Sequence, residues 1–405
     1  MYRFLATDPS RFAHPRPDGF GHDADHAHGL ATTMSDVYSK QPKIIPSLDG
    51  IRAISVLLVM LGHSGLEGLA PGGLGVTIFF FLSGYLISTL MLAENERTSG
   101  IDILRFYARR ILRLMPPLFI SLAIAYGLTY AGWLSGSITT AGMTAQLLYF
   151  ANYYGLFFDP GNTIPDGTGI LWSLAVEEHF YIFYPCLMTL LLSSALRPRT
   201  IGTLLGIACL VVLAWRIYLV HSPDFMSNRT YYASDTRIDS IIYGCILAIV
   251  MNPIRQLHRP RAMSLAQWTV LAAAAATLLL TLLYRHPVFR ETTRYSIQGL
   301  ALMPVFYFAI RFSDTQPFRH LNSPWAITLG TYSYAIYLIH YVVIMLIAKN
   351  APAIAAKPII LFPTALLISI AYAAAIDRFV DRYFRPLRNK CGPRVAKKVD
   401  VGQEL

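Results

Sequence analysis

Long apolar runs, separated by short basic or polar segments, recur along the chain after Pro46. A helix of about 20 apolar residues is long enough to cross a bilayer. The pattern predicts about ten membrane-spanning helices, over residues 51–69, 77–93, 114–133, 171–195, 201–220, 236–251, 265–284, 295–311, 327–348 and 358–376. Residues 146–154 are apolar but too short to span, and they predict a re-entrant or surface helix on the outer side.

The two ends of the chain differ from the apolar runs between them. Residues 1–46 are polar, rich in His, Asp and Pro, and have no helical apolar period, which predicts a disordered tail. Residues 387–405 form a strongly basic tail. Residues 47–386 are therefore predicted to form one transmembrane domain of the all-α integral membrane class.

Composition and charge support this class. The 405 residues are 54% hydrophobic and only 14% charged, whereas a soluble domain has about 25% charged residues. The net charge of +11 gathers in the connectors, with five arginines in residues 94–113. Because cytoplasmic loops are rich in Lys and Arg, both termini are predicted to be cytoplasmic. The charge therefore indicates an inner (plasma) membrane protein rather than a nucleic-acid partner.

Two ionisable side chains in the first apolar run suggest chemistry. Arg52 lies near its start and His63 lies eleven residues later, about 16 Å along one helix face. An ionisable residue within a span is costly and usually functional. The competing interpretation is an Arg that reaches the membrane surface and a His that bonds a neighbouring helix.

The run LWSLAVEEHFY carries two adjacent carboxylates, of which only one can point into the bundle. Glu177 shares a stripe with Ser173 and Tyr181, which favours it over Glu178. A structural salt bridge from Glu177 to an arginine of another span is the competing interpretation. The sequence alone does not decide which carboxylate faces inward.

Three further groups are candidates. Arg237 and Asp239 open the run at 236–251 and could anchor the interface or pair with Glu177. His340, near the middle of the run at 327–348, is a second candidate base, weaker than His63. Arg110 and Arg113 lie three residues apart and share a face at the predicted cytoplasmic surface.

The arginine pair has two interpretations. Guanidinium groups suit bidentate capture of phosphates, but basic residues in this place also set topology and bind lipid headgroups. The four cysteines form no CxxC pair, so neither a disulfide framework nor a zinc site is indicated. The spans show no His/Asp cluster typical of a metal site, and we predict neither a metal nor a permanently bound cofactor.

Five segments, taken in order, resemble the membrane acyltransferase-3 family over residues 46–386. They are SLDGIRAISVLLVMLGH, FFFLSGYLIS, FYARRILRLMPP, LWSLAVEEHFY and GTYSYAIYLIH. The resemblance implies an integral membrane enzyme that transfers an acyl group, usually acetyl. The implied donor is cytoplasmic acyl-CoA, and the implied acceptor is a hydroxyl of an extracytoplasmic carbohydrate such as O-antigen or exopolysaccharide. The tail VDRYFRP departs from the family's usual spacing at this point.

The resemblance also assigns roles. Its arginine–histidine motif falls on Arg52 and His63, with His63 as general base or transient acyl carrier and Arg52 positioning the donor. Its RxxR motif falls on Arg110 and Arg113, which would bind the phosphates of acyl-CoA. Glu177 would tune His63 or bind the acceptor. The predicted acceptor-binding residues are Trp172, Ser173, Tyr181, Arg237 and Asp239.

A different class of protein remains an alternative from the residues alone. Intramembrane His, Glu and Arg also serve proton-coupled transport, so a transporter or flippase of a glycan or small molecule is the second hypothesis. Such a protein has no need for an arginine pair that binds acyl-CoA.

Overall fold

The structure is a computed structural model, and it describes residues 45–67, 71–159, 161, 163–194, 196–226, 228–256 and 262–392. Most of the predicted N-terminal tail and the last part of the basic C-terminal tail lie outside these residues. The described helices belong to one compact unit that begins at Pro46. Within the described residues the only β-structure is an isolated bridge between Gly136 and Pro165, so the described fold is all-α.

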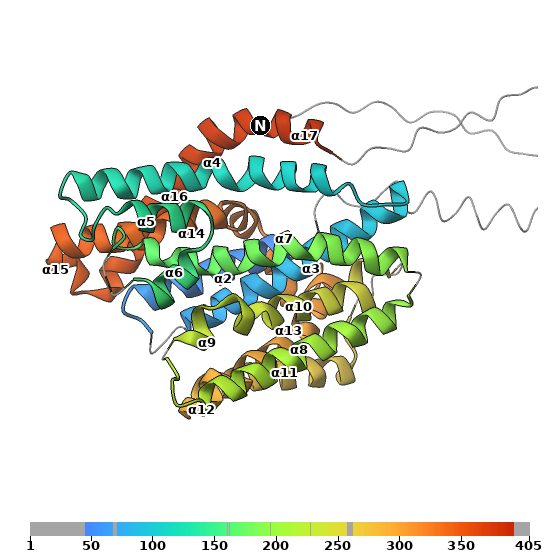
Figure 1. The fold of residues 1–405 in the computed structure, drawn as a ribbon. Helices are drawn as coiled ribbons and strands as arrows, with labels where there is room; N and C mark the ends of the chain where they lie inside the picture. Colours follow the sequence, from blue (N-terminus) through green and yellow to red (C-terminus); the bar gives the residue numbers. More distant parts are fainter. Residues whose placement is uncertain are drawn as a thin grey trace, which may run out of the picture. The chain divides into compact units, whose positions relative to one another are not determined.

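Long helices run side by side through this unit, with α4 along one edge and α8 and α11 along the opposite edge (Figure 1). The first half of the chain contributes α2 Leu48–His63, α3 Gly72–Thr98, α4 Ile103–Tyr130, α5 Thr140–Leu147, α6 Ala151–Phe157, η1 Thr168–Leu171, α7 Trp172–Ser193 and α8 Pro198–Val220. The second half contributes α9 Arg229–Tyr232, α10 Ser234–Val250, η2 Pro253–Arg255, α11 Leu265–Leu283, α12 Pro287–Glu291, α13 Thr293–Arg311, η3 Phe318–Asn322, α14 Pro324–Asn350, α15 Pro352–Ala355, α16 Pro358–Ala375, η4 Ile376–Asp381 and α17 Arg382–Lys390.

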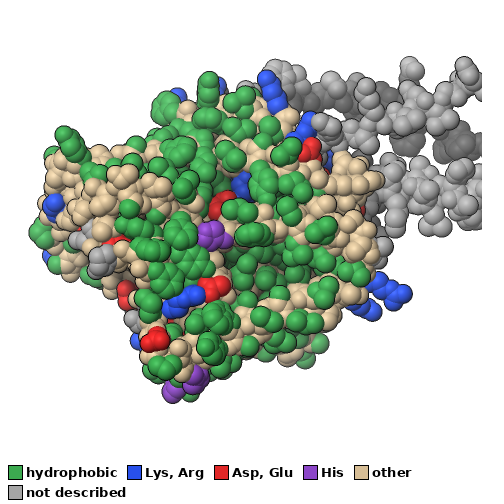
Figure 2. All heavy atoms as spheres, in the orientation of Figure 1, with side chains coloured by type: hydrophobic (Ala, Val, Ile, Leu, Met, Phe, Trp, Pro, Cys, Tyr) green, Lys and Arg blue, Asp and Glu red, His purple; other side chains and the backbone are tan. Residues whose placement is uncertain are grey.

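Seven of the described helical segments are long and apolar enough to cross a membrane. They are α3, α4, α8, α10 with η2, α11, α14, and α16 with η4 and α17. Three of the ten predicted spans are not among them, because α2 has only 16 residues, α7 carries Glu177, Glu178 and His179, and α13 contains several polar side chains. Hydrophobic side chains cover most of the face in Figure 2, as expected for helices in lipid.

The first helix ends earlier than the apolar pattern predicts. The sequence predicts a span to Leu69, but α2 ends at His63. Gly65 follows with a φ of +81°, and the Leu66 amide donates to the carbonyl of Leu61 at 3.2 Å. This is the hydrogen-bond pattern of a glycine-terminated helix. His63 therefore lies at the end of its helix rather than in the middle of a span.

The apolar segment at 146–154 does not form one helix. Tyr149 adopts a φ of +56°, which ends α5 and separates it from α6. Both helices are far too short to span a bilayer, which agrees with the prediction for this segment.

Glycines allow a close helix crossing between α3 and α10. A Cβ placed at Gly244 would lie 2.0 Å from the Phe81 carbonyl oxygen, and one at Gly84 would lie 2.0 Å from the Ile241 carbonyl oxygen. Small residues at such crossings let two backbones approach closely. This crossing brings α3 and α10 into the core, where most of their side chains are buried.

We expect Gly244→Ala to destabilise the folded protein by about 1–3 kcal/mol, because the added methyl group overpacks the crossing. Gly206→Ala on α8 is the matched control, since a Cβ there meets nothing within 4 Å. Removing a helical glycine at an open position should be neutral or stabilising by up to about 1 kcal/mol. Thermal midpoints of the detergent-solubilised variants measure the difference, and equal midpoints would contradict the packing argument.

Candidate active site

Two histidines from helices far apart in the sequence form a direct pair. Nδ1 of His63, at the end of α2, lies 2.9 Å from Nε2 of His340 on α14. The ring of Tyr341 stacks on His63 with centroids 4.4 Å apart. His340 is fully buried, whereas His63 is half-buried. His63 is therefore held from two sides and still has an accessible surface.

The hydrogen bonds of this histidine pair fix its tautomers. Nδ1 of His340 lies 2.8 Å from the carbonyl oxygen of Tyr337, which can only accept, so this nitrogen carries the proton. Because a charged ring would be costly at a fully buried site without a carboxylate, Nε2 of a neutral His340 accepts from Nδ1 of His63. We call this series of hydrogen bonds, from His63 through His340 to Tyr337, the relay. It leaves Nε2 of a neutral His63 unprotonated, which is the form that a base or nucleophile requires.

The side chain of Tyr337 anchors this relay. Its hydroxyl lies 2.6 Å from Oγ of Ser173 and donates to the carbonyl of Ile170 at 3.0 Å. Ser173, predicted to bind the acceptor, thus supports the turn of α14 from which His340 is held. Its hydroxyl lies within the protein and connects α7 to the histidine pair.

The carboxylate of Glu177 bonds Ser83 and Tyr181 rather than His63, while its predicted role in acceptor binding stays a prediction. Its carboxylate accepts from Ser83 at 2.9 Å and from Tyr181 at 3.4 Å, and Ser83 and Tyr181 also bond each other. No hydrogen bond joins Glu177 to His63 among the described residues, and the partner of His63 is His340. The sequence could not show this pairing, because 277 residues separate the two histidines.

The interhelical ion pair of α7 uses the neighbouring carboxylate. Arg110 donates to Oε1 of Glu178 through Nε at 3.0 Å and Nη2 at 2.9 Å. Its guanidinium also lies 3.1 Å from the ring centroid of Tyr181. Arg110 is thus fixed between α4 and α7 rather than free at the surface, and the predicted salt bridge of Glu177 is made by Glu178.

Four arginines lie close together where the sequence predicts that acyl-CoA binds. Arg113 is exposed and has no hydrogen bond or ion pair with any described residue. Arg52, Arg110 and Arg388 lie close enough to act electrostatically on Arg113. Arg52 pairs with Asp49 at 2.6 Å, and Arg388 on α17 pairs with Asp381 at 2.7 Å. The carboxylate of Asp381 also acts on Arg113 electrostatically, but Arg113 is the member of this arginine cluster whose guanidinium has no direct partner among the described residues.

The predicted acceptor residue Asp239 is occupied by a structural bond. Its carboxylate lies 2.7 Å from Nη2 of Arg216, and both side chains are 0% exposed. Ser296 donates to the same carboxylate oxygen at 3.2 Å. The pair joins α8, α10 and α13 in the core, which gives Asp239 a structural role, and substrate binding by this residue stays a prediction. Arg216 lies in an apolar run and has no neighbouring motif that would have revealed it.

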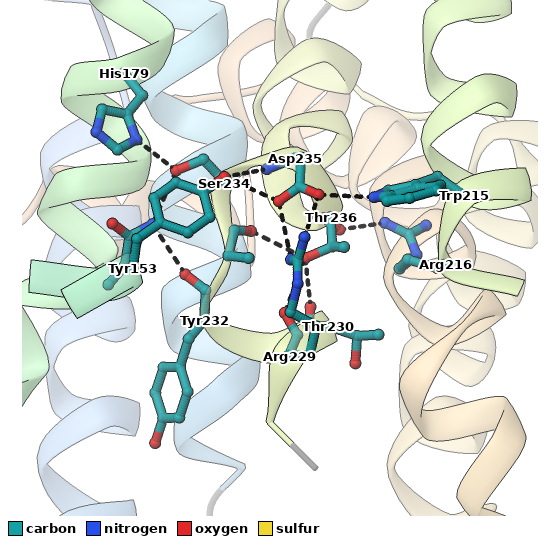
Figure 3. Close-up of polar contacts among 12 residues, drawn as sticks. Tyr153, His179, Trp215, Arg216, Arg229, Thr230, Tyr232, Ser234, Asp235 and Thr236 are labelled. Atoms are coloured by element: carbon teal, nitrogen blue, oxygen red, sulfur yellow. Dashed lines mark hydrogen bonds and ion pairs between the residues drawn. The ribbon is translucent and has the colours of Figure 1, made fainter. Parts of the chain in front are cut away.

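A second polar network holds the start of α10 (Figure 3). Asp235 accepts from Tyr153 at 2.9 Å, from Trp215 at 2.7 Å, and from both Nη atoms of Arg229. His179 Nδ1 lies 2.6 Å from Oγ of Ser234 beside it. The network ties α6, α7, α8 and α9 to α10, and its charged groups, Arg229 and Asp235, pair with each other.

Within the described residues no group of three or more His, Cys, Asp or Glu could hold a metal ion. The hydrogen bonds of the histidine pair offer the chemistry of an imidazole with a free Nε2, backed by a buried second imidazole. Arg52 lies on the helix that ends at His63, and the guanidinium of Arg113 lies close to the guanidinium of Arg52. Such an arrangement suits proton transfer or group transfer from an anionic donor.

The apolar helices and this buried polar centre define a multi-pass membrane protein with an enzyme-like site. A family model described as an acyltransferase domain matches residues 45–378. The chain therefore belongs to this acyltransferase family, the one that its motifs resemble.

Curated relatives match along most of the chain. The O-acetyltransferase OatA of Staphylococcus aureus, from strain NCTC 8325 / PS 47 and from strain COL, is 28% identical over 370 residues. The match covers 88% of this chain and 59% of the relative. The chain thus spans about three fifths of the length of these relatives. No solved structure matches it significantly.

Proposed function

We propose that the protein is an O-acyltransferase of the plasma membrane, with about ten spans and both termini in the cytoplasm. It moves an acetyl group from cytoplasmic acetyl-CoA to a hydroxyl of an extracytoplasmic carbohydrate. The observation that supports this most is the His63–His340–Tyr337 relay, which leaves Nε2 of His63 free. Family membership and the O-acetyltransferase relatives support the reaction class.

The relay serves transfer in either of two ways. As a general base, Nε2 of His63 takes the proton of the acceptor hydroxyl while its oxygen bonds to the thioester carbonyl carbon. The C–S bond then breaks, and the thiolate of coenzyme A takes the proton back from His63. As an acyl carrier, Nε2 attacks the carbonyl carbon itself, the C–S bond breaks, and coenzyme A leaves as a thiolate. The acceptor oxygen then bonds to the acetyl carbon as the N–C bond breaks, and the freed Nε2 takes the hydroxyl proton and passes it to the thiolate. Both routes require the same unprotonated nitrogen.

The arginine cluster is the proposed donor site. Arg113 lacks a carboxylate partner, so a phosphate of acetyl-CoA supplies the missing charge. Arg52 lies on α2, eleven residues before His63, and is proposed to guide the donor toward it. Arg110 has a supporting role, because Glu178 and Tyr181 already hold its guanidinium.

The direct test is consumption of acetyl-CoA by the purified full-length protein in nanodiscs with an oligosaccharide acceptor. We expect thioester loss to depend on the acceptor and acetate to appear on its hydroxyls by mass spectrometry. A protein that moves glycan across the bilayer without consuming the thioester would be a transporter, and the proposal would be wrong.

We expect Arg113→Gln to raise the apparent KM for acetyl-CoA by about tenfold or more, because a charge-assisted hydrogen bond contributes about 1.5–3 kcal/mol. The change should leave kcat nearly constant. Arg110→Gln is the contrasting variant, which should mainly lower the thermal midpoint by leaving Glu178 without its partner. If both variants raise KM equally without loss of stability, the two arginines share one role and the assignment is incorrect.

A further inference from the structure

A fully buried arginine lies in a cage of aromatic rings formed by four different helices. The guanidinium carbon of Arg237 is 4.1 Å from the ring centroid of Tyr295, 5.3 Å from that of Tyr231, 5.4 Å from that of Phe80 and 5.9 Å from that of Trp172. We call these rings the aromatic cage. The cage holds the cation but gives it almost no hydrogen-bond acceptors.

The N–H groups of Arg237 form few hydrogen bonds. Nη2 donates to Thr77 at 3.1 Å and Nη1 to the carbonyl of Tyr231 at 3.5 Å, while Nε is buried without a partner. No described carboxylate forms an ion pair with it: Asp239 on the same helix acts on it electrostatically but forms its ion pair with Arg216. A buried charge without a directly bonded counter-charge is costly, and the free Nε can still donate to an anion.

A second arginine lies against the same ring. The guanidinium carbon of Arg294 is 4.8 Å from the centroid of Tyr295, and its Nη2 donates to the hydroxyl of Tyr295 at 2.9 Å. Its Nε is also buried without a partner. The two guanidinium groups act on each other electrostatically, and like charges repel. An anion that accepts from both would remove this repulsion.

Nearby acidic groups do not supply that anion. Burial raises the pKa of the Tyr231 hydroxyl to about 12, although Arg237 and Arg294 lie close to it. Tyr231 therefore stays neutral at physiological pH. Glu291 bonds Thr230 and forms no ion pair with either arginine.

The cage adjoins the histidine pair. The hydroxyl of Tyr231 lies 3.3 Å from where a Cβ of Gly73 would be, at the start of α3, and Gly72 beside it packs on the last turns of α2. Trp172 of the cage precedes Ser173, which bonds Tyr337 of the relay. An acceptor bound at the cage would thus lie at the same end of the bundle as His63.

We propose that Arg237 and Arg294 bind an anionic group of the acceptor, a phosphate or a carboxylate, so that the protein acylates an acidic carbohydrate. This assignment rests on the proposed O-acyltransferase function and adds the class of its acceptor. Two guanidinium groups match the oxygens of such an anion by charge-assisted hydrogen bonds. Three rings of the cage are buried, whereas the ring of Tyr231 is partly exposed and is the one that an adjoining sugar can contact.

The test measures binding rather than turnover. The Tm of the detergent-solubilised full-length protein is recorded with glucose 6-phosphate, with glucuronic acid and with neutral glucose at constant ionic strength. We expect a saturable rise in Tm with at least one anionic sugar and none with glucose. The sugar with the lower half-saturating concentration identifies phosphate or carboxylate as the preferred group.

Variants separate this site from the donor site. Arg294→Gln should raise the half-saturating concentration at least tenfold, and Arg237→Lys, which keeps the charge but not the fork of donors, should weaken binding less. Arg285→Gln, at an exposed arginine between α11 and α12, and Arg113→Gln should keep the shift. Because Arg237→Lys keeps the buried positive charge, it should fold even where a neutral variant at this position does not.

The proposal is overturned by an absent shift with both anionic sugars in the wild-type protein. It is also overturned if Arg113→Gln removes the shift while Arg294→Gln keeps it, because the anions would then occupy the donor site. Failure of the transferase function gives a different result, in which the shift persists but no acetyl-CoA is consumed.

Discussion

His63→Ala is expected to lower the rate of acetyl transfer by about 10²- to 10⁴-fold, the usual contribution of a general acid–base group. The reason is the loss of the only free imidazole nitrogen in the His63–His340–Tyr337 relay. The side chain is half-buried at the end of α2, so its truncation should leave insertion and folding intact. Acetyl-CoA turnover in nanodiscs and gel-filtration profiles measure the two quantities.

His340 variants show whether the relay matters beyond packing. His340→Gln can place a carbonyl oxygen where Nε2 accepts from His63, and we expect it to keep much more activity than His340→Ala. The loss in His340→Ala should fall on kcat and alter the pH profile, because His63 is then free to adopt its other tautomer. Equal activity of these two variants, or normal turnover by His63→Ala, would refute the role given to the pair.

Asp239→Ala is expected to destabilise the protein by about 3–5 kcal/mol, the effect of leaving one member of a buried ion pair without its partner. Arg216 would remain fully buried, with only Ser296 and the carbonyls of Thr236 and Thr292 as acceptors. The expected observation is a large drop in the thermal midpoint and in the yield of folded protein.

The matched control replaces both members of the pair. Arg216→Met combined with Asp239→Leu removes both charges, and it should be clearly more stable than Asp239→Ala, because apolar replacements of buried pairs are often tolerated. Additive losses in the double variant would show that the two charges act independently. A normal midpoint with weakened acceptor binding in Asp239→Ala would instead restore the substrate role predicted from the sequence.

Much of the helix arrangement could be predicted from the sequence. The apolar runs at 201–220 and 265–284 coincide almost residue for residue with α8 and α11, because lipid-facing helices are apolar on most sides. The end of α2 could not be found this way, since Leu66 and Leu69 continue the apolar run. There the left-handed backbone of Gly65, a local geometric feature, decides where the helix ends.

The site was predictable in its residue types but not in its partners. Arg52, His63, Arg110 and Arg113 stand out because charged or polar groups are rare in apolar runs, and their motifs indicate the family. The sequence gives no indication that Glu178 rather than Glu177 bonds Arg110, since the two carboxylates are adjacent in the same turn of α7. It also ranks His340 below His63, although the two rings form one unit.

The sequence by itself therefore determined the class of protein, the family and the residues able to carry charge within the membrane. These follow from composition and from local spacing, which report on burial in lipid and on the cost of placing ionisable groups there. Only the tertiary structure decided which charges neutralise one another, because α2 meets α14 and α8 meets α10 through contacts between distant segments. Among the described residues, that pairing leaves Nε2 of His63, the guanidinium of Arg113 and the Nε atoms of Arg237 and Arg294 without a hydrogen-bond partner.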